Sequence, residues 1–187
     1  IYRGEWEMAE ARHRGALASF ERNDDKRKAA WSMQNLGLAL RGQKRFGEAI
    51  VVLRNASSIL RDLGDLHNWA TAYMNLGITY YFSGENDTAI DCYLEVEFIL
   101  NHHHDRLRIA DLHVNLGLAY LANNAYESAI NSFLSSIRLF DELGIQSMVV
   151  NAMDGLALSY IGQQKFDLAI QVINEAMTRL PQIVNVP

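Results

Sequence analysis

The chain has 187 residues, of which 49% are hydrophobic, and carries a net charge of −5 at pH 7. This composition is typical of a folded protein and argues against a surface dedicated to DNA or RNA, which needs a basic stripe to displace counterions. No apolar run approaches the ~18 residues of a membrane span, and one cysteine excludes an internal disulfide framework. We therefore expect a cytoplasmic protein that contacts neither membranes nor nucleic acids directly.

A 40-residue period divides the sequence. One short phrase recurs, as NLGLAL at 35–40, NLGITY at 75–80, NLGLAY at 115–120 and, weakened, GLALSY at 155–160. The only two prolines lie in the last seven residues, so almost the whole chain is free to be helical. The predicted segments are the second helix of a preceding repeat over 1–24 and four repeats over 25–64, 65–104, 105–144 and 145–187.

The first full repeat shows the pattern that the others follow. Leu36 and Leu40 share one face of a first helix, and a second apolar stripe with spacing i, i+3, i+4, i+7 begins at Phe46. The break RGQKR separates the two stripes, which predicts a pair of antiparallel helices.

Other residues at the same spacing mark the helix ends. Asp25, Asp65 and Asp105 precede first helices, where a carboxylate can accept hydrogen bonds from free N–H groups. Gly64 and Gly144 follow second helices, where a left-handed residue closes the end. Small residues also stand inside the first helices, namely Gly37, Gly77, Gly117 and Ala157. Glycine costs ~1 kcal/mol there relative to alanine, so we expect close contact with the alanine of the neighbouring helix, such as Ala49.

This pattern resembles the tetratricopeptide repeat, whose two helices carry Leu-Gly, Tyr, Ala and an aromatic residue in order. The third repeat matches it with Leu116-Gly117, Tyr120, Ala129 and Phe133. The period exceeds the usual 34 residues and is similar to that of Pins/LGN-type scaffolds and bacterial MalT-like regulators. The resemblance implies an all-α fold: a right-handed α-solenoid of antiparallel helix pairs, with four repeats plus an N-terminal half repeat. First helices would line a concave groove for peptides or protein segments.

An asparagine ladder is the sharpest candidate feature of this groove. Asn35, Asn75 and Asn115 recur at one position, and a carboxamide can pair with the amide of an extended peptide without reading its side chains. Asparagine here resembles the peptide-gripping asparagines of several tetratricopeptide families. Alternatively, each asparagine bonds a neighbouring helix and holds the repeat geometry. In the fourth repeat Gly155 takes the position, and Asn151 lies one turn earlier.

Further residues of the first helices complete the predicted concave face. They are Trp31, Gln34, Leu38, Arg41, Met74, Ile78, Tyr81, Phe82, Asp111, Leu118 and Asp154. The apolar members predict an apolar or amphipathic ligand, unless they pack between adjacent first helices instead. No nucleotide-binding, metalloprotease or serine-hydrolase motif is present, so we expect no catalytic residue, metal site or cofactor.

The last predicted helix, over 166–180, is apolar nearly all round, whereas a terminal repeat normally needs a polar outer face. Either the array continues in a longer protein or this end packs on another copy. The leading interpretation is a non-catalytic interaction module, a fragment of a larger protein, that binds a peptide or protein segment. The alternatives are the sensor or regulatory array of a bacterial signal-transduction or transcriptional regulator, and a self-association scaffold that forms homo-oligomers through this end.

Overall fold

The computed structural model describes residues 3–184, with side chains for 4–102 and 104–180. Within this range the fold is all-α, as expected, and the outermost residues of the predicted segments 1–24 and 145–187 lie outside it. Its helices are α1 (Arg3–Arg22), α2 (Lys26–Gly42), α3 (Phe46–Asp62), α4 (Leu66–Ser83), α5 (Asn86–His103), α6 (Arg106–Ala122), α7 (Tyr126–Glu142), α8 (Gln146–Gly162) and α9 (Phe166–Val184). No helix of the described part is long and apolar enough to cross a membrane.

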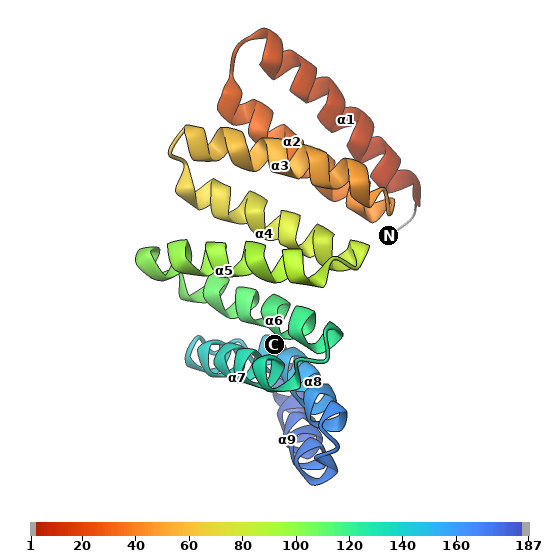
Figure 1. Ribbon diagram of the computed structural model, residues 1–187, viewed down its shortest axis with the longest axis vertical. Helices are drawn as coiled ribbons and strands as arrows, with labels where there is room; N and C mark the ends of the chain where they lie inside the picture. Colours follow the sequence, from red (N-terminus) through yellow and green to blue (C-terminus); the bar gives the residue numbers. More distant parts are fainter. Residues whose placement is uncertain (1–2, 185–187) are drawn as a thin grey trace. The chain divides into compact units, whose positions relative to one another are not determined.

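The chain forms two compact units, Ile1–Ile99 and Leu100–Pro187. In the first unit, consecutive helices pack antiparallel in sequence order, from α1 on α2 to α3 on α4 (Figure 1). The first helices α2 and α4 also contact each other directly. Leu36, Leu40 and Ala49 form a buried cluster between α2 and α3, with Leu17 of α1 packed against it. The predicted helix pairs are therefore confirmed in this unit.

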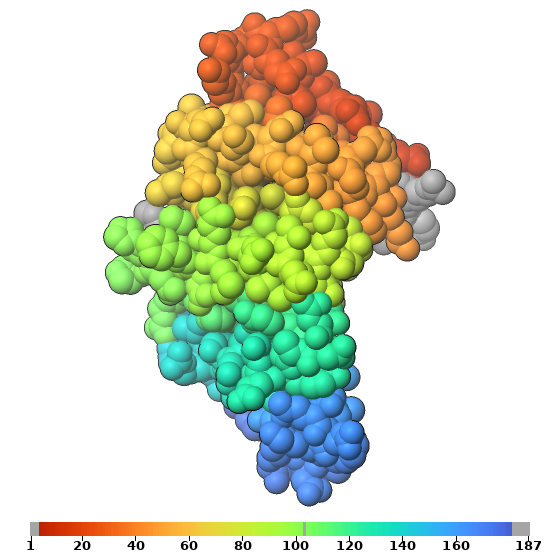
Figure 2. Space-filling model, viewed as in Figure 1, coloured from red at the N-terminus to blue at the C-terminus, as the bar shows by residue number. Residues whose placement is uncertain are grey.

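The second unit repeats this arrangement, with α6 on α7, α7 on α8, α8 on α9, and α6 against α8. Two aromatic side chains of α7, Phe133 and Phe140, are fully buried at its centre. Phe133 packs with Ala152 and Leu156 of α8, and Phe140 with Val149 and Met153 of the same helix. Burying each ring stabilises the fold by roughly 2–3 kcal/mol. In Figure 2 side chains fill the spaces that separate neighbouring ribbons within each unit in Figure 1.

All the turns that join the described helices share one backbone form. A residue with φ between 51° and 89° stands every 20 positions, at Asp24, Lys44, Gly64, Gly84, His104, Asn124, Gly144 and Gln164. The N–H of the following residue donates to the carbonyl five residues back, as from Asp25 to Phe20 at 3.0 Å and from Ile145 to Phe140 at 2.9 Å. This bond satisfies a carbonyl that the helix end leaves free. Gly64 and Gly144 were expected in this role, and the left-handed conformation at both is confirmed.

Aspartates cap three of the first helices, as expected. The side chains of Asp25, Asp65 and Asp105 each accept a hydrogen bond from the backbone N–H three residues on, at 3.1, 3.4 and 3.2 Å. The corresponding residue before α8 is Ile145, which offers no such cap. Helix α8 therefore depends more on packing than the other first helices do.

The mid-helix glycines face a large side chain rather than the alanine that we expected. A Cβ at Gly37 would lie 2.5 Å from the Leu53 side chain, and one at Gly117 would lie 2.7 Å from the Phe133 ring. The expectation was wrong about the partner because the large residue lies one turn beyond Ala49 and its counterparts. That residue fills the space between the helices, and only glycine leaves room for it.

Candidate functional site

In the first unit, the surface shared by α2 and α4 carries many of the residues predicted to bind a ligand. Gln34 Nε2 donates to the Asn68 carbonyl at 3.4 Å, and Arg41 Nη1 donates to the Asn75 carbonyl at 3.3 Å. Both bonds run from α2 to α4, so these two side chains help to hold the first helices side by side. They are therefore partly structural, which the sequence pattern did not indicate.

The ladder asparagines of this unit do not tie helices together through their carboxamides. Asn35 is exposed, and its Nδ2 donates to the Trp31 carbonyl of its own helix at 3.1 Å. The half-buried Asn75 uses only its backbone carbonyl, which accepts from Arg41 and, at 2.7 Å, from Thr79 Oγ1. Within the described residues its carboxamide has no hydrogen-bond partner. This geometry does not fit the alternative in which each asparagine bonds a neighbouring helix.

In the second unit the ladder position is occupied by Asn115 in the third repeat and by Gly155 in the fourth. Asn115 is half-buried, and its carboxamide likewise has no hydrogen-bond partner among the residues that the structure describes. At the next position, 40 residues on, a Cβ on the buried Gly155 would overlap the ring of Phe133. No larger residue fits there unless the Phe133 ring moves. Asn151 and Asp154 are exposed on α8.

The apolar candidates divide into packed and exposed residues. Leu38, Met74, Ile78, Tyr81 and Leu118 are half-buried. Leu118 packs against the cluster around Phe133, as the alternative role in helix packing predicts. Trp31 is 43% exposed and Phe82 is 56% exposed, so both present a large apolar surface to a ligand.

Asp111 differs from the other candidates in its electrostatic setting. Its side chain is half-buried, and burial raises the pKa of this carboxyl, with the charge of Asp105 adding to the effect. A ligand cation or hydrogen-bond donor beside it would lower that pKa again.

A pocket of about 410 Å³ lies at the C-terminal ends of α2 and α4. Its lining residues are Trp6, Leu38, Arg41, Gly42, Lys44, Phe46 and Phe82. Leu38, Arg41 and Phe82 were predicted to bind a ligand, whereas Trp6, Lys44 and Phe46 were missed. The 40-residue alignment of Trp6 with Phe46 was the available signal, because the two aromatic residues occupy the same position of the repeat.

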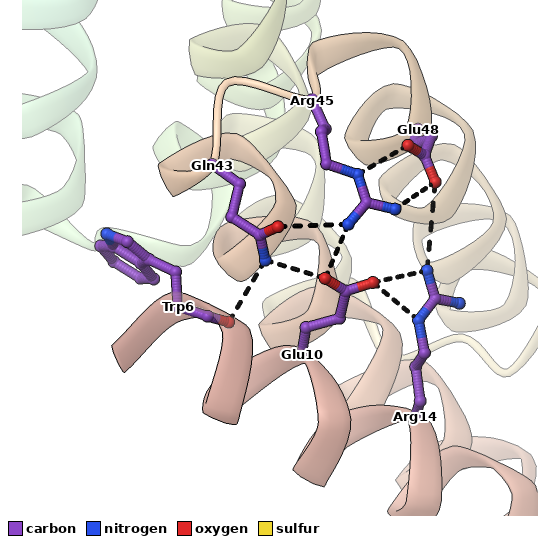
Figure 3. Close-up of polar contacts among 6 residues, drawn as sticks. All are labelled: Trp6, Glu10, Arg14, Gln43, Arg45 and Glu48. Atoms are coloured by element: carbon purple, nitrogen blue, oxygen red, sulfur yellow. Dashed lines mark hydrogen bonds and ion pairs between the residues drawn. The ribbon is translucent and has the colours of Figure 1, made fainter. Parts of the chain in front are cut away.

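A polar network fixes the pocket wall that α1 supplies (Figure 3). The Glu10 carboxylate accepts from Gln43 Nε2 at 2.8 Å, from Arg45 Nη1 at 2.7 Å and from Arg14 Nε at 2.9 Å. Gln43 Nε2 also donates to the Trp6 carbonyl at 3.3 Å. The hydrogen bond from Gln43 is the main reason that the pKa of Glu10 is lowered. The network joins α1 to the turn between α2 and α3, and so holds the backbone of Trp6 in place.

A glycine allows the Trp6 ring to lie against the end of α2. A Cβ at Gly42 would come 2.5 Å from this ring, so the indole rests on bare backbone. The same arrangement recurs in the second unit, where Tyr126 lies against Gly162. In α4 the residue in register is Phe82 rather than glycine, and its side chain joins Phe46 in lining the pocket.

Sequence comparison assigns this architecture to a family. Two models of the tetratricopeptide repeat match the chain, one over residues 1–62 and the other over 70–97 and 110–142. The chain belongs to the tetratricopeptide repeat family. No curated protein matches it in sequence.

Solved structures share the tetratricopeptide fold at low sequence identity. The TPR-like repeats of a Podosopora anserina protein described as a kinesin light chain superpose with a TM-score of 0.81 at 15% identity, covering 98% of this chain and 90% of that one. MamA superposes with a TM-score of 0.71 at 21% identity, covering 98% of this chain and 93% of that one. Aspartyl phosphate phosphatase F from Bacillus subtilis superposes with a TM-score of 0.73 at 17% identity, covering 89% of this chain and 44% of that one. At these identities the likeness concerns the fold alone.

Side chains that could bind a metal are dispersed over the described part of this tetratricopeptide chain. Among the described residues, no three His, Cys, Asp or Glu side chains come together as metal ligands. Cys92 is buried, and burial raises the pKa of its thiol to about 11. The thiol therefore stays protonated near neutral pH and is a poor nucleophile.

Proposed function

We propose that this tetratricopeptide chain is a non-catalytic interaction module that binds an extended peptide segment of a partner protein along its first helices. The supporting observation is that the carboxamides of Asn75 and Asn115 have no hydrogen-bond partner in the described structure, although both residues are half-buried. Each carboxamide can donate to and accept from a peptide backbone. Because polar groups at half-buried positions gain from being paired, a bound segment would use them.

The surface beside the ladder suits such a segment. Trp31 lies one turn from Asn35 on α2, and Phe82 lies two turns from Asn75 on α4. In this mode the carboxamides would supply affinity for any extended backbone, and the exposed aromatic side chains would select apolar side chains of the partner.

The experiment compares the parent with an Asn35→Ala, Asn75→Ala, Asn115→Ala variant. The matched control carries Asn55→Ala, Asn131→Ala and Asn174→Ala, which remove three exposed asparagines from second helices. Each protein is used in a pull-down with mass spectrometry, and captured partners are then measured against each variant by calorimetry. A segment bound on α2 and α4 of the first unit would lose two hydrogen bonds of about 1 kcal/mol each, which corresponds to roughly thirtyfold weaker binding by the ladder variant.

The control triple should bind the partner as the parent does, and circular dichroism should show the same helicity for all three proteins. A partner held with equal affinity by the ladder variant would move the binding surface away from these asparagines. A partner lost equally by both triples would indicate a general surface effect and would also contradict the proposal.

Self-association is a second candidate, supported by the exposed face of α9. Met177 is 63% exposed, and Ile170 and Ile173 on the same face are also exposed. The residues 40 positions earlier, Ile130 and Phe133, are buried under α8. An apolar helix face of this kind is typical of an interface between subunits.

The test for self-association is the mass in solution, measured by light scattering over a range of concentrations. If the α9 face joins two copies, Met177→Glu should convert dimer to monomer. Val51→Glu, at an exposed apolar residue of α3, should leave the mass unchanged. A parent protein that stays monomeric up to high concentration would eliminate this candidate.

A further inference from the structure

Two cations of the pocket between α1, α2, α3 and α4 lack a counter-charge. Arg41 and Lys44 line it, and none of its lining residues is acidic. Neither side chain pairs with a carboxylate in the described part of the chain. Other arginines of the first unit do form such pairs, as Arg45 does with Glu10 and Arg61 with Glu95. Arg41 and Lys44 thus bring two unpaired positive charges to one pocket of a chain with a net charge of −5.

Arg41 keeps hydrogen-bonding capacity for a ligand. One of its terminal nitrogens donates to the Asn75 carbonyl at 3.3 Å, and a guanidinium has five N–H donors in all. Burial lowers the pKa of Arg41, although an arginine stays charged at neutral pH. A half-buried charge that has lost part of its hydration gains more from an anion than an exposed charge does.

Apolar side chains form most of the remaining wall. Trp6, Phe46 and Phe82 contribute aromatic rings from three different helices, and Leu38 adds an aliphatic surface. The volume of about 410 Å³ lies within the range of pockets that hold small molecules, roughly 300–1,000 Å³. The bonds of Gln43 to Glu10 and to the Trp6 carbonyl hold the α1 side of the wall in place without a ligand.

The other repeats show that the fold does not require these charges. The residues in register with Arg41 are Tyr81, Leu121 and Ile161. The residues in register with Lys44 are Gly84, Asn124 and Gln164, which also have positive φ. Phe82 likewise replaces the glycine found at 42 and 162. The cations and the extra ring therefore occur together at one pocket, in addition to what helix packing needs.

We propose that this pocket binds a small aromatic carboxylate, with its ring among Trp6, Phe46 and Phe82 and its carboxylate on Arg41 and Lys44. Guanidinium and ammonium groups recognise carboxylates, and aromatic walls recognise a flat apolar body. The pocket shares Phe82 with the peptide surface proposed above but does not use the ladder carboxamides, so the two proposals can be tested separately. An aromatic residue at the C-terminus of a peptide carries the same chemistry, and the experiment separates the two sources.

The first measurement uses indole-3-acetate and indole-3-acetamide, which share one ring and differ in charge. Binding is followed by NMR through the indole N–H signal of Trp6, assigned with a Trp6→Phe variant. We expect a saturable shift with the acid and at least tenfold weaker binding of the amide. Equal affinity for the two compounds would overturn the proposal.

Two substitutions then test the two cations, each introducing the residue that another repeat carries at the same position. Arg41→Leu copies Leu121, and Lys44→Gln copies Gln164. We expect at least tenfold weaker binding of indole-3-acetate with Arg41→Leu and several-fold weaker binding with Lys44→Gln. The matched control is Lys165→Gln, at an exposed lysine in the turn before α9, which should bind like the parent.

A third variant, Phe82→Ala, introduces the residue found at the matching position 122. It keeps the proposal testable if Arg41→Leu fails to fold. Phe82 is exposed, so its loss should leave the NMR spectrum folded and still weaken binding several-fold. Unchanged affinity in Arg41→Leu and Phe82→Ala would overturn the proposal. The tripeptide Gly-Gly-Trp with a free carboxylate distinguishes the sources. If this tripeptide binds more tightly than indole-3-acetate, the pocket is a site for the C-terminus of a peptide, and the proposal of a small aromatic acid fails.

Discussion

Helices α7 and α9 are built on one pattern but differ in what covers them. Phe133 of α7 is 1% exposed, whereas Ile173, 40 residues later in α9, is 43% exposed. Phe140 and Leu180 show the same contrast between a buried and an exposed residue. The difference arises because α8 packs over α7, while no helix of the described chain covers that face of α9. A residue in this array is therefore buried by the next helix along the chain rather than by its own helix, as in other nearest-neighbour repeat proteins.

Truncating the two matched residues should give the largest effect. Phe133→Ala removes a ring that packs with Ala152 and Leu156 of α8, and should lower the free energy of unfolding by about 3–5 kcal/mol. Ile173→Ala should lower it by under about 1 kcal/mol, because the side chain is already half in water. Chemical denaturation followed by circular dichroism measures both. Similar losses for the two variants would mean that the face of α9 is covered in solution.

The contact between α7 and α8 can also be tested from the α8 side. Gly155→Ala places a methyl group into the Phe133 ring, and overpacking of this kind should cost about 1–3 kcal/mol. The matched control is Gly15→Ala in α1, where nothing lies within 4 Å of the new Cβ, and where we expect a gain of up to about 1 kcal/mol. Thermal unfolding of both variants should give shifts of opposite sign. A stabilised Gly155→Ala protein would show that α7 and α8 are packed less closely than described.

The smallest expected effect concerns the ion pair that joins α9 to α7. Arg179 Nη1 donates to Asp141 Oδ1 at 2.7 Å, and this bond, followed by that from Gln146, lowers the pKa of Asp141. A carboxyl with a lowered folded-state pKa stabilises the fold above its ordinary titration range, and that stability is lost as the pH falls. Arg179→Met should therefore lower stability at pH 7 by under about 1 kcal/mol, since the pair is partly exposed.

The pH dependence supplies the check on this ion pair. Denaturation midpoints measured from neutral pH down to acid pH should fall less steeply in Arg179→Met than in the parent. Arg138→Met, at an exposed arginine of α7, should keep the slope of the parent. Parallel curves for the parent and Arg179→Met would show that the pair does not link the two helices in solution.

The helices and their caps could be predicted from sequence because both depend on residues a few positions apart. The period of Leu36 and Leu40, and the position of Asp105 before α6, are local features that one repeat is enough to show. The candidate pocket could not be predicted in this way. It requires Trp6 and Phe82, 76 positions apart in sequence, to line the same space.

The partner of Gly37 shows the same limit within one repeat. The 40-residue register reveals that a glycine and an alanine recur together, but not which side chain fills the space beside the glycine. That depends on how far one helix slides along the other, and the structure gives Leu53. The ladder position Gly155 is a similar case, because its environment is set by Phe133 of the preceding helix. Contacts between helices therefore could not be predicted from the sequence, whereas most helix limits could.

The left-handed residue that recurs every 20 positions has a consequence for how such a chain can change length. Each turn closes in the same way whether the residue is glycine, asparagine, lysine or histidine. A duplicated stretch of 40 residues would therefore splice between two existing turns without altering either junction. An insertion inside a helix that does not match this spacing would instead shift one turn out of register with the next. Growth and loss of this protein by whole modules would therefore keep every junction unchanged.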